Sequence, residues 1–232
     1  MRRTARLAAP AVLLLALPAC TTPQTGAPAE PDRPLRATLT TPTDIDLTWE
    51  DDHAGHVLEF ATDEAGPYTV LRYLPAGVTG HRHPDLMPRT TFHYRLRAYR
   101  GPASEPVRVD LPGRGAPAAD DEAWLAPRTE PGRQGAGRPL THPAGVPSGF
   151  TADVRAADGI RFRWTDNSTD EDGFLLEIRR TRGTPFEPVA VLDPDVNSTG
   201  LITLPGEEHA SYRVRGFTLG ERSNVVRLTT GG

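Results

Sequence analysis

The sequence of 232 residues contains the same strand pattern twice. In each half, an alternating strand ends in tryptophan (Trp49 and Trp164), a second strand follows a glycine, and a third begins with tyrosine (Tyr94 and Tyr212). Alternation of apolar and polar residues with a period of two is typical of a half-buried β-strand. The sequence therefore predicts two copies of one all-β domain rather than a single large domain.

The N-terminus has the features of a targeting segment. Three arginines precede an apolar stretch over residues 8–17, which is too short to span a bilayer. The stretch ends in Leu17-Pro18-Ala19-Cys20, which resembles the lipobox of bacterial lipoproteins, and Cys20 is the single cysteine of the chain. The resemblance implies a signal peptide over residues 1–19 and lipidation of Cys20, so we expect a membrane anchor on an extracytoplasmic protein.

Two proline-rich stretches without periodicity divide the rest of the chain. We expect a disordered tether over residues 20–33 and a flexible Pro/Gly-rich linker over residues 113–145. These stretches delimit two predicted domains, at residues 34–112 and 146–232. Within the linker, Trp124 follows a short acidic run, which predicts one helical turn. We expect the indole of Trp124 to rest on a neighbouring domain.

Both halves resemble fibronectin type III domains, which are seven-stranded immunoglobulin-like sandwiches. The resemblance rests on the tryptophan strands, on Asp85-Leu86-Met87-Pro88-Arg89-Thr90-Thr91-Phe92-His93-Tyr94, and on Trp164-Thr165-Asp166-Asn167-Ser168 with Gly173-Phe174. The latter run is similar to bacterial members of the family. The resemblance implies two β-sandwiches, but it implies no ligand, because this fold serves many unrelated roles.

Composition excludes several function classes. All 26 basic residues are arginine, the net charge is −4, and no basic run marks one face, so we expect no nucleic-acid partner. The sequence contains no Gly-x-Ser-x-Gly elbow and no glycine-rich phosphate loop. We therefore predict a protein without enzymatic activity and without a cofactor.

Four histidines of the first half form one candidate metal site: His53, His56, His81 and His83. Their His-x-x-His and His-x-His spacings would suit zinc or copper if the two pairs converged. No cysteine accompanies them, and His56 aligns with Phe174 of the second half, which favours a position at the edge of the core. We predict no metal at these residues.

The acidic residues 166–172 form the other candidate, because with Glu177 at the twelfth place they partly imitate a calcium loop. Glu171, however, occupies the sixth position, where such a loop requires glycine, and Glu177 is expected on a strand. We interpret the segment as a solvated acidic turn and predict no metal site there.

Three aromatic residues are the candidate binding residues: Tyr99, Phe217 and Trp124. Tyr99 and Phe217 occupy equivalent strand-end positions, where we expect them, with Tyr73, to be exposed. Exposed aromatic rings stack on sugars or anchor protein interfaces. These residues therefore indicate a recognition surface, with ordinary packing as the alternative.

Outward-facing arginines are expected on the same strands, at Arg95, Arg97, Arg213 and Arg215. They lie opposite Glu59 and Glu177 in the predicted sheets. Cross-strand ion pairs of this kind usually form a solvated face.

Together these features predict a lipid-anchored protein of the bacterial cell envelope. Its expected role is that of a non-catalytic binding or adaptor module for an envelope protein or a polysaccharide. Two alternatives remain open. One is a passive structural spacer without a specific ligand, and the other is a calcium- or transition-metal-responsive module.

Overall fold

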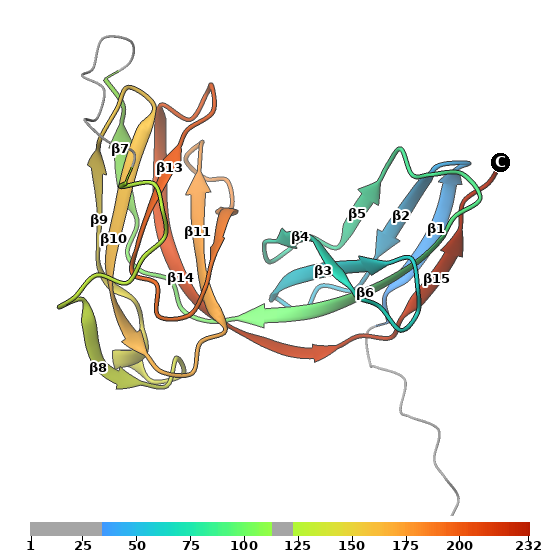
Figure 1. Ribbon diagram of the computed structural model, residues 1–232, viewed down its shortest axis with the longest axis horizontal. Coiled ribbons are helices and arrows are strands. Elements are labelled where there is room, and N and C mark those ends of the chain that lie inside the picture. Colours follow the sequence, from blue (N-terminus) through green and yellow to red (C-terminus); the bar gives the residue numbers. More distant parts are fainter. Residues whose placement is uncertain (1–33, 113–122) are drawn as a thin grey trace, which may run out of the picture. The chain divides into compact units, whose positions relative to one another are not determined.

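The computed structural model describes residues 34–112 and 123–232, and the regular secondary structure of these residues is almost entirely β-strand (Figure 1). The predicted all-β class with two sandwiches is confirmed. No helix within the described residues is long and apolar enough to cross a membrane. The predicted signal peptide, the lipidation site Cys20 and the tether lie outside the described residues.

The first sandwich consists of two antiparallel sheets, with strand orders β1-β2-β5 and β4-β3-β6-β15. The strands of the smaller sheet are β1 (Arg36–Thr41), β2 (Asp44–Thr48) and β5 (Gly80–His83). Those of the larger sheet are β3 (Gly55–Ala61), β4 (Thr69–Leu74), β6 (Thr91–Arg100) and β15 (Val226–Thr229).

The second sandwich repeats this arrangement, with strand orders β9-β10-β13 and β12-β11-β14-β7. The first of these sheets contains β9 (Ser148–Val154), β10 (Gly159–Ser168) and β13 (Ser198–Ile202). The other contains β7 (Val107–Asp110), β11 (Gly173–Arg179), β12 (Glu187–Leu192) and β14 (His209–Arg222).

Each sandwich has its own apolar core, built from the residues that the alternating pattern directs inward. Trp49 and Tyr94 are buried in the first core, and Trp164 and Tyr212 are buried in the second. Because successive side chains of a strand point to opposite faces, the polar residues between them face outward. The equivalent tryptophans and tyrosines therefore have equivalent structural roles, as the sequence repeat predicts.

The two sandwiches exchange their last strands. β7 follows β6 along the chain but pairs with β14, so that Tyr212 lies opposite Val107. β15 follows β14 but pairs with β6, so that Tyr94 lies opposite Val226 (Figure 1). Strand pairing therefore crosses between the two sequence repeats, and each sandwich is completed by a strand from the other half of the chain.

The exchange takes place where β6 and β14 pair with each other, with Thr218 opposite Arg100. Directly after β6, Gly101 passes so close to β14 that an added Cβ would lie 2.0 Å from the carbonyl oxygen of Gly216. No side chain fits at that distance, so the crossing requires glycine at position 101.

Two equivalent serines fix the exchanged segments. The backbone N–H of Ser104 donates to the carbonyl of Val214 (2.8 Å), and its Oγ accepts from the N–H of Val214 (3.2 Å). Ser223 forms the same two bonds with Leu96, at 2.8 and 2.9 Å. The matching bonds show that both halves enter the partner sandwich in the same way.

Residues 123–145 differ from the expectation of a flexible linker, because they are hydrogen-bonded to the second sandwich. β8 (Gln134–Arg138) runs parallel to the end of β10, and a short 3-10 helix spans Pro143–Gly145. The backbone N–H of Arg128 also donates to the carbonyl of Ser198. Backbone pairing needs no alternating side-chain pattern, so composition alone did not indicate this segment. Residues 113–122 lie outside the described residues.

Candidate functional site

Tyr99 and Phe217 lie at the junction of the two sandwiches, where they pack against each other rather than facing solvent. Their side chains belong to a buried cluster with Val57 and Leu175, and the two ring centroids are 6.0 Å apart. Tyr99 is only 3% exposed and Phe217 only 2%. The predicted exposure of these rings is therefore wrong, because each strand end is covered by the other half of the chain.

Trp124 is also buried, and it lies against the second sandwich. An added Cβ would lie 2.5 Å from its indole at Gly159 and 2.8 Å from it at Gly200, so two glycines make room for the ring. The indole thus rests on a domain as expected, from a turn rather than a helix. Its burial leaves little surface for a ligand.

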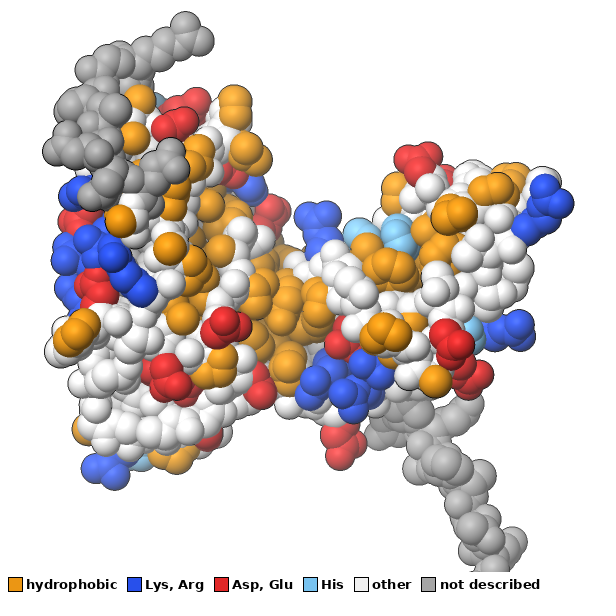
Figure 2. All heavy atoms as spheres, viewed as in Figure 1, with side chains coloured by type: hydrophobic (Ala, Val, Ile, Leu, Met, Phe, Trp, Pro, Cys, Tyr) orange, Lys and Arg blue, Asp and Glu red, His pale blue; other side chains and the backbone are white. Residues whose placement is uncertain are grey.

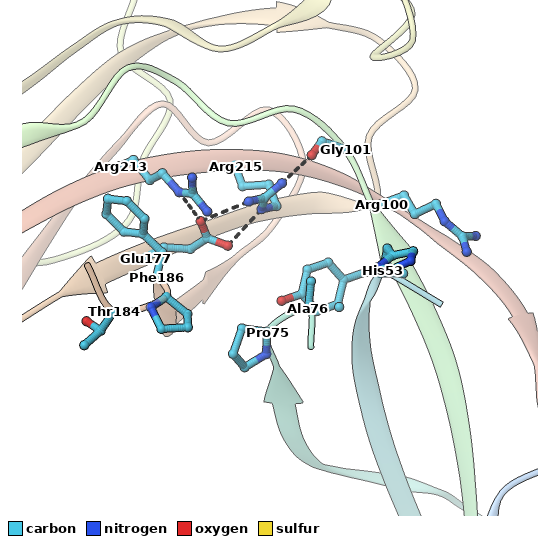
Figure 3. Close-up of a pocket in the computed structure, with 14 residues that line it drawn as sticks. His53, Pro75, Ala76, Arg100, Gly101, Glu177, Thr184, Phe186, Arg213 and Arg215 are labelled. Carbon is cyan, nitrogen blue, oxygen red and sulfur yellow. Dashed lines mark hydrogen bonds and ion pairs between the residues drawn. The ribbon is translucent and has the colours of Figure 1, made fainter. Parts of the chain in front are cut away.

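A pocket of about 410 Å³ opens beside the buried junction cluster (Figure 3). We call it the junction pocket, and its lining comes from both sandwiches. The first contributes residues 53–55, 75–76 and 99–101, and the second contributes Glu177, residues 184–186, Arg213 and Arg215. The junction pocket is therefore a product of the strand exchange, which brings the two linings together.

Two arginines share one carboxylate at the wall of the junction pocket. Glu177, on β11, accepts hydrogen bonds from Nε of Arg213 and, at 2.8 Å, from Nε of Arg215 (Figure 3). The predicted cross-strand pairing is confirmed, but the predicted solvated face is wrong for Glu177, which is 2% exposed. Burial lowers the pKa of the Arg213 guanidinium, against the opposing effect of Glu177. Two guanidinium groups on one carboxylate leave one positive charge without compensation.

The first half contains a simpler version of this arrangement, in which Arg95 pairs with Glu59 through a single guanidinium. Arg97, the remaining predicted outward arginine, donates through Nε to the carbonyl of Gly220 (3.2 Å).

Arg100 and Phe186 complete the chemistry of the junction pocket. The Arg100 guanidinium is largely exposed and donates to Asp52 (2.8 Å). The guanidinium of Arg213 lies over the Phe186 ring, 4.0 Å from the ring centroid, a distance typical of a cation–π contact. The pocket is thus suited to an acidic group with an adjacent flat or apolar surface. Sequence reasoning missed both residues, although Arg100 directly follows the candidate Tyr99.

A second surface feature, the apolar groove, is lined by residues 70–73 of β4 and 188–191 of β12 and has a volume of about 640 Å³. Val70 and Val191 are 46% and 49% exposed, which is high for large apolar residues. Figure 2 shows hydrophobic side chains gathered in the region between β11 and β4. Tyr73 joins the groove to the junction cluster, since its ring centroid lies 5.9 Å from those of Tyr99 and Phe217.

The four histidines of the first half do not converge on a metal site. His56 contacts Asp52, with 3.2 Å between Nε2 and Oδ1, and packs edge-on against Trp49. On β5, Nδ1 of His83 forms a hydrogen bond with the hydroxyl of Tyr94 (3.0 Å). Over residues 34–112 and 123–232, no group of metal-ligating atoms contains a histidine. His56 and His83 therefore occupy the edge of the core, whereas the side chain of His53 is exposed.

The acidic loop after β10 does not form the twelve-residue calcium loop either. Glu177, its twelfth position, lies on β11 and is bound to arginines. The prediction of a solvated turn is nevertheless wrong for two of its residues, because Asp166 is 1% exposed and Glu171 is 9% exposed. Both carboxylates fold inward, beneath the loop.

Comparison with known proteins finds only solved structures of low sequence identity. No family model matches the sequence, and no curated protein matches it. A two fibronectin type III domain segment of chicken tenascin is 17% identical, with 86% of this chain and all of that chain covered and a TM-score of 0.26. The FN1–FN3 domains of chicken CNTN1 are 14% identical, with 89% of this chain and 68% of that chain covered and a TM-score of 0.27.

Proposed function

We propose that this chain is a non-catalytic binding module of the bacterial cell envelope, anchored to the membrane through a lipid on Cys20. Its partner is an envelope protein that occupies the apolar groove and places an acidic group in the junction pocket. The observation that supports this proposal is the apolar groove itself. Exposed Val70 and Val191 line it, and it continues through Tyr73 to the junction of the sandwiches.

The strands that line the apolar groove favour a protein over a polysaccharide. β4 and β12 lie at the two ends of the strand order β12-β11-β14-β6-β3-β4, so each has one unpaired edge in this sheet. An extended peptide can add to such an edge through its backbone while its side chains fill apolar pockets. A polysaccharide would gain less from Val70 and Val191, because sugars are recognised mainly by polar groups and flat aromatic rings.

The charge of the junction pocket supports an acidic group on the partner. Arg213 and Arg215 share Glu177, and Arg100 is largely exposed beside them. A carboxylate can accept two parallel hydrogen bonds from one guanidinium, which fixes its orientation as well as its distance. The partner is therefore an apolar, extended segment that ends in, or is flanked by, an acidic residue.

The test is cross-linking of the full-length lipidated protein in intact cells, followed by mass spectrometry. We compare the native chain with V70E/V191E and with L204E, a control at another exposed apolar residue that lines neither the apolar groove nor the junction pocket. The proposal predicts one dominant envelope protein with the native chain and L204E, and its loss with V70E/V191E. Equal capture by all three would contradict the apolar groove.

Two other results would favour the alternatives. Capture of cell-wall polysaccharide that depends on Arg100 would indicate a glycan ligand, and diffuse capture that no variant changes would indicate a passive spacer. The anchor has a separate test, because C20S is expected to move the protein from the membrane fraction to the soluble fraction. Unchanged membrane association of C20S would contradict lipidation at this residue.

A further inference from the structure

We propose a calcium-binding site in the second sandwich, formed by the carboxylates of Asp166, Glu171 and Asp195. One oxygen from each side chain lies within 4.8 Å of the other two. The site is independent of the junction pocket and of the apolar groove, since it shares no residue with either.

Three separate segments place these carboxylates. Asp166 lies near the end of β10, Glu171 lies in the loop between β10 and β11, and Asp195 lies in the loop between β12 and β13. The backbone N–H of Asp195 donates to Oε1 of Glu171 (3.3 Å), which brings the two loops together. Asp195 is exposed, so an ion could enter from its side.

Two buried carboxylate oxygens of the group receive no hydrogen bond from any residue that the structure describes. Oδ1 of Asp166 accepts from the backbone N–H and the hydroxyl of Ser168, at 3.0 and 3.1 Å, but Oδ2 has no partner. Oε2 of Glu171 is likewise buried and without a partner. An unpaired buried carboxylate oxygen destabilises the folded state, because it has lost its hydrogen bonds to water without forming new ones in the protein.

The negative charge of this group has no positive side chain beside it among residues 34–112 and 123–232. Within the described parts of the chain, none of the three carboxylates forms an ion pair with arginine or histidine. Burial raises the pKa of Asp166, and the carboxylates of Glu171 and Asp195 raise it further, against the hydrogen bonds from Ser168. The group therefore has the charge and the free oxygens that a cation would satisfy.

The ligand set favours calcium over other common cations. All three ligands are carboxylate oxygens, which calcium and magnesium prefer, whereas zinc prefers nitrogen and sulfur. Calcium binds oxygen at about 2.3–2.6 Å, so two ligands on opposite sides of one ion lie up to about 5 Å apart. Magnesium needs shorter bonds and a stricter octahedron, which three separate segments are less suited to provide. Water at the exposed side of Asp195 would complete the coordination.

Calcium at this site would fix residues 128–138 on the second sandwich. The carbonyl of Asp195 accepts from the hydroxyl of Thr129 (2.8 Å), and the backbone N–H of Asp166 donates to the carbonyl of Arg133 (3.0 Å). The site thus lies directly beneath residues 128–138. We expect calcium to slow hydrogen exchange in this segment as well as in the two loops.

The experiment titrates calcium chloride into the mature chain, residues 20–232 with C20S, by calorimetry and by thermal unfolding. We expect one calcium per chain, a dissociation constant of about 10⁻⁴–10⁻³ M, as in other extracellular modules, and a rise in Tm that EGTA reverses. D195N should weaken binding by about tenfold or more, whereas D193N, in the same loop, should not. Magnesium chloride at the same concentration should have a much smaller effect.

D166N separates a calcium site from a merely structural acidic cluster. It removes negative charge from the buried group, so it should raise the Tm of the calcium-free protein while abolishing the response to calcium. The absence of heat and of a Tm shift at about 10 mM calcium would overturn the proposal. Calcium binding that persists unchanged in D166N and D195N, or an equal response to magnesium, would overturn it as well.

Discussion

The two sandwiches are closed in the same way but differ in how their equivalent loops compensate acidic side chains. In the first sandwich, Asp52 pairs with Arg100 and contacts His56. In the second, Asp166 and Glu171 are buried together, and no described arginine or histidine pairs with either of them. The shared part of the repeat is the core and the strand crossing, whereas the loops have diverged. The repeat therefore determines the architecture, and the loops at its ends provide the individual chemistry.

Removing the last strand should cause the largest loss of stability, and this loss should fall on the first sandwich. A chain that stops after Asn224 lacks β15, whose Val226 and Leu228 pack on the first core. We expect β3 and β6 to lose hydrogen-exchange protection, while β10 and β11 keep it. Hydrogen exchange with mass spectrometry makes the comparison, and loss of protection in the second sandwich instead would contradict the exchange of strands.

Gly101→Ala should destabilise the whole protein by roughly 3–5 kcal/mol, the range of severe single substitutions. Its Cβ would lie 2.0 Å from the carbonyl oxygen of Gly216, and backbone at a crossing cannot move aside. The matched control is Gly220→Ala on the other crossing strand, where the nearest atom, the carbonyl oxygen of Ala98, would lie at 3.4 Å. Urea unfolding of both variants measures the difference, and two equal effects would argue against a tight crossing at position 101.

The equivalent glutamates should differ in their contribution to the free energy of unfolding. Glu177→Gln leaves Arg213 and Arg215 without their shared carboxylate in a largely buried site, so we expect a loss of about 2–3 kcal/mol. Glu59 binds a single arginine and is itself more exposed than Glu177 (12% against 2%), so for Glu59→Gln we expect about 1 kcal/mol or less. Denaturant unfolding at neutral pH compares the two, and a larger effect of Glu59→Gln would reverse the ranking of the two sites.

The smallest expected effect is that of pH on stability. Lowering the pH should change the stability of the two sandwiches in opposite directions. Burial lowers the pKa of His56, His81 and His83 below the usual 6.5, so the unfolded first sandwich takes up protons more readily than the folded one. Its stability should therefore fall as the pH decreases below about 6.5. Region-resolved hydrogen exchange at pH 7 and at pH 5 measures this, and constant stability of the first sandwich would contradict it.

In the second sandwich, the raised pKa of Asp166 reverses the sign. The folded state binds this proton more readily than the unfolded state, so the calcium-free second sandwich should gain stability as the pH falls towards the usual Asp value of 3.8. D166N is the control, since it removes the titrating group. Persistence of the gain in D166N would assign it to other carboxylates.

Much of each sandwich could be predicted from sequence, because the information is local. The alternation around Trp49 and Trp164 identifies strands and their inward faces, and the registers of Glu59 and Glu177 identify their arginine partners. These features depend on neighbours within one strand or one strand pair. A period of two is sufficient to predict them.

The exchange of strands could not be predicted, because β7 and β15 have nearly the same pattern of apolar and polar residues. Val107-Arg108-Val109 and Val226-Arg227-Leu228 have the same alternation, so either run fits either sandwich. The choice depends on the path of the backbone beyond Gly101, where no side chain provides a signal. The burial of Tyr99 and Phe217 follows from this choice, which explains why their predicted exposure failed.

The group formed by Asp166, Glu171 and Asp195 could not be predicted from the sequence for a related reason. Asp166 at the end of β10 and Glu171 in the following loop belong to one short run that partly imitates a calcium loop, but Asp195 comes from the loop between β12 and β13. A linear motif cannot include a ligand contributed by a different segment. Only the packing of the two loops, through the bond between Asp195 and Glu171, reveals the group.

Disulfide trapping in the C20S chain tests whether the two sandwiches exchange their last strands. Two side-chain pairs are in contact in the exchanged arrangement, Asp110 with His209 (3.0 Å) and Thr91 with Thr229 (2.9 Å). Cysteine pairs at 110/209 and at 91/229 should therefore oxidise rapidly within one monomer, whereas the pair at 91/110 should remain reduced. Rapid oxidation of 91/110 with reduced 110/209 and 91/229 would show that each strand returns to its own sandwich, and would contradict the account.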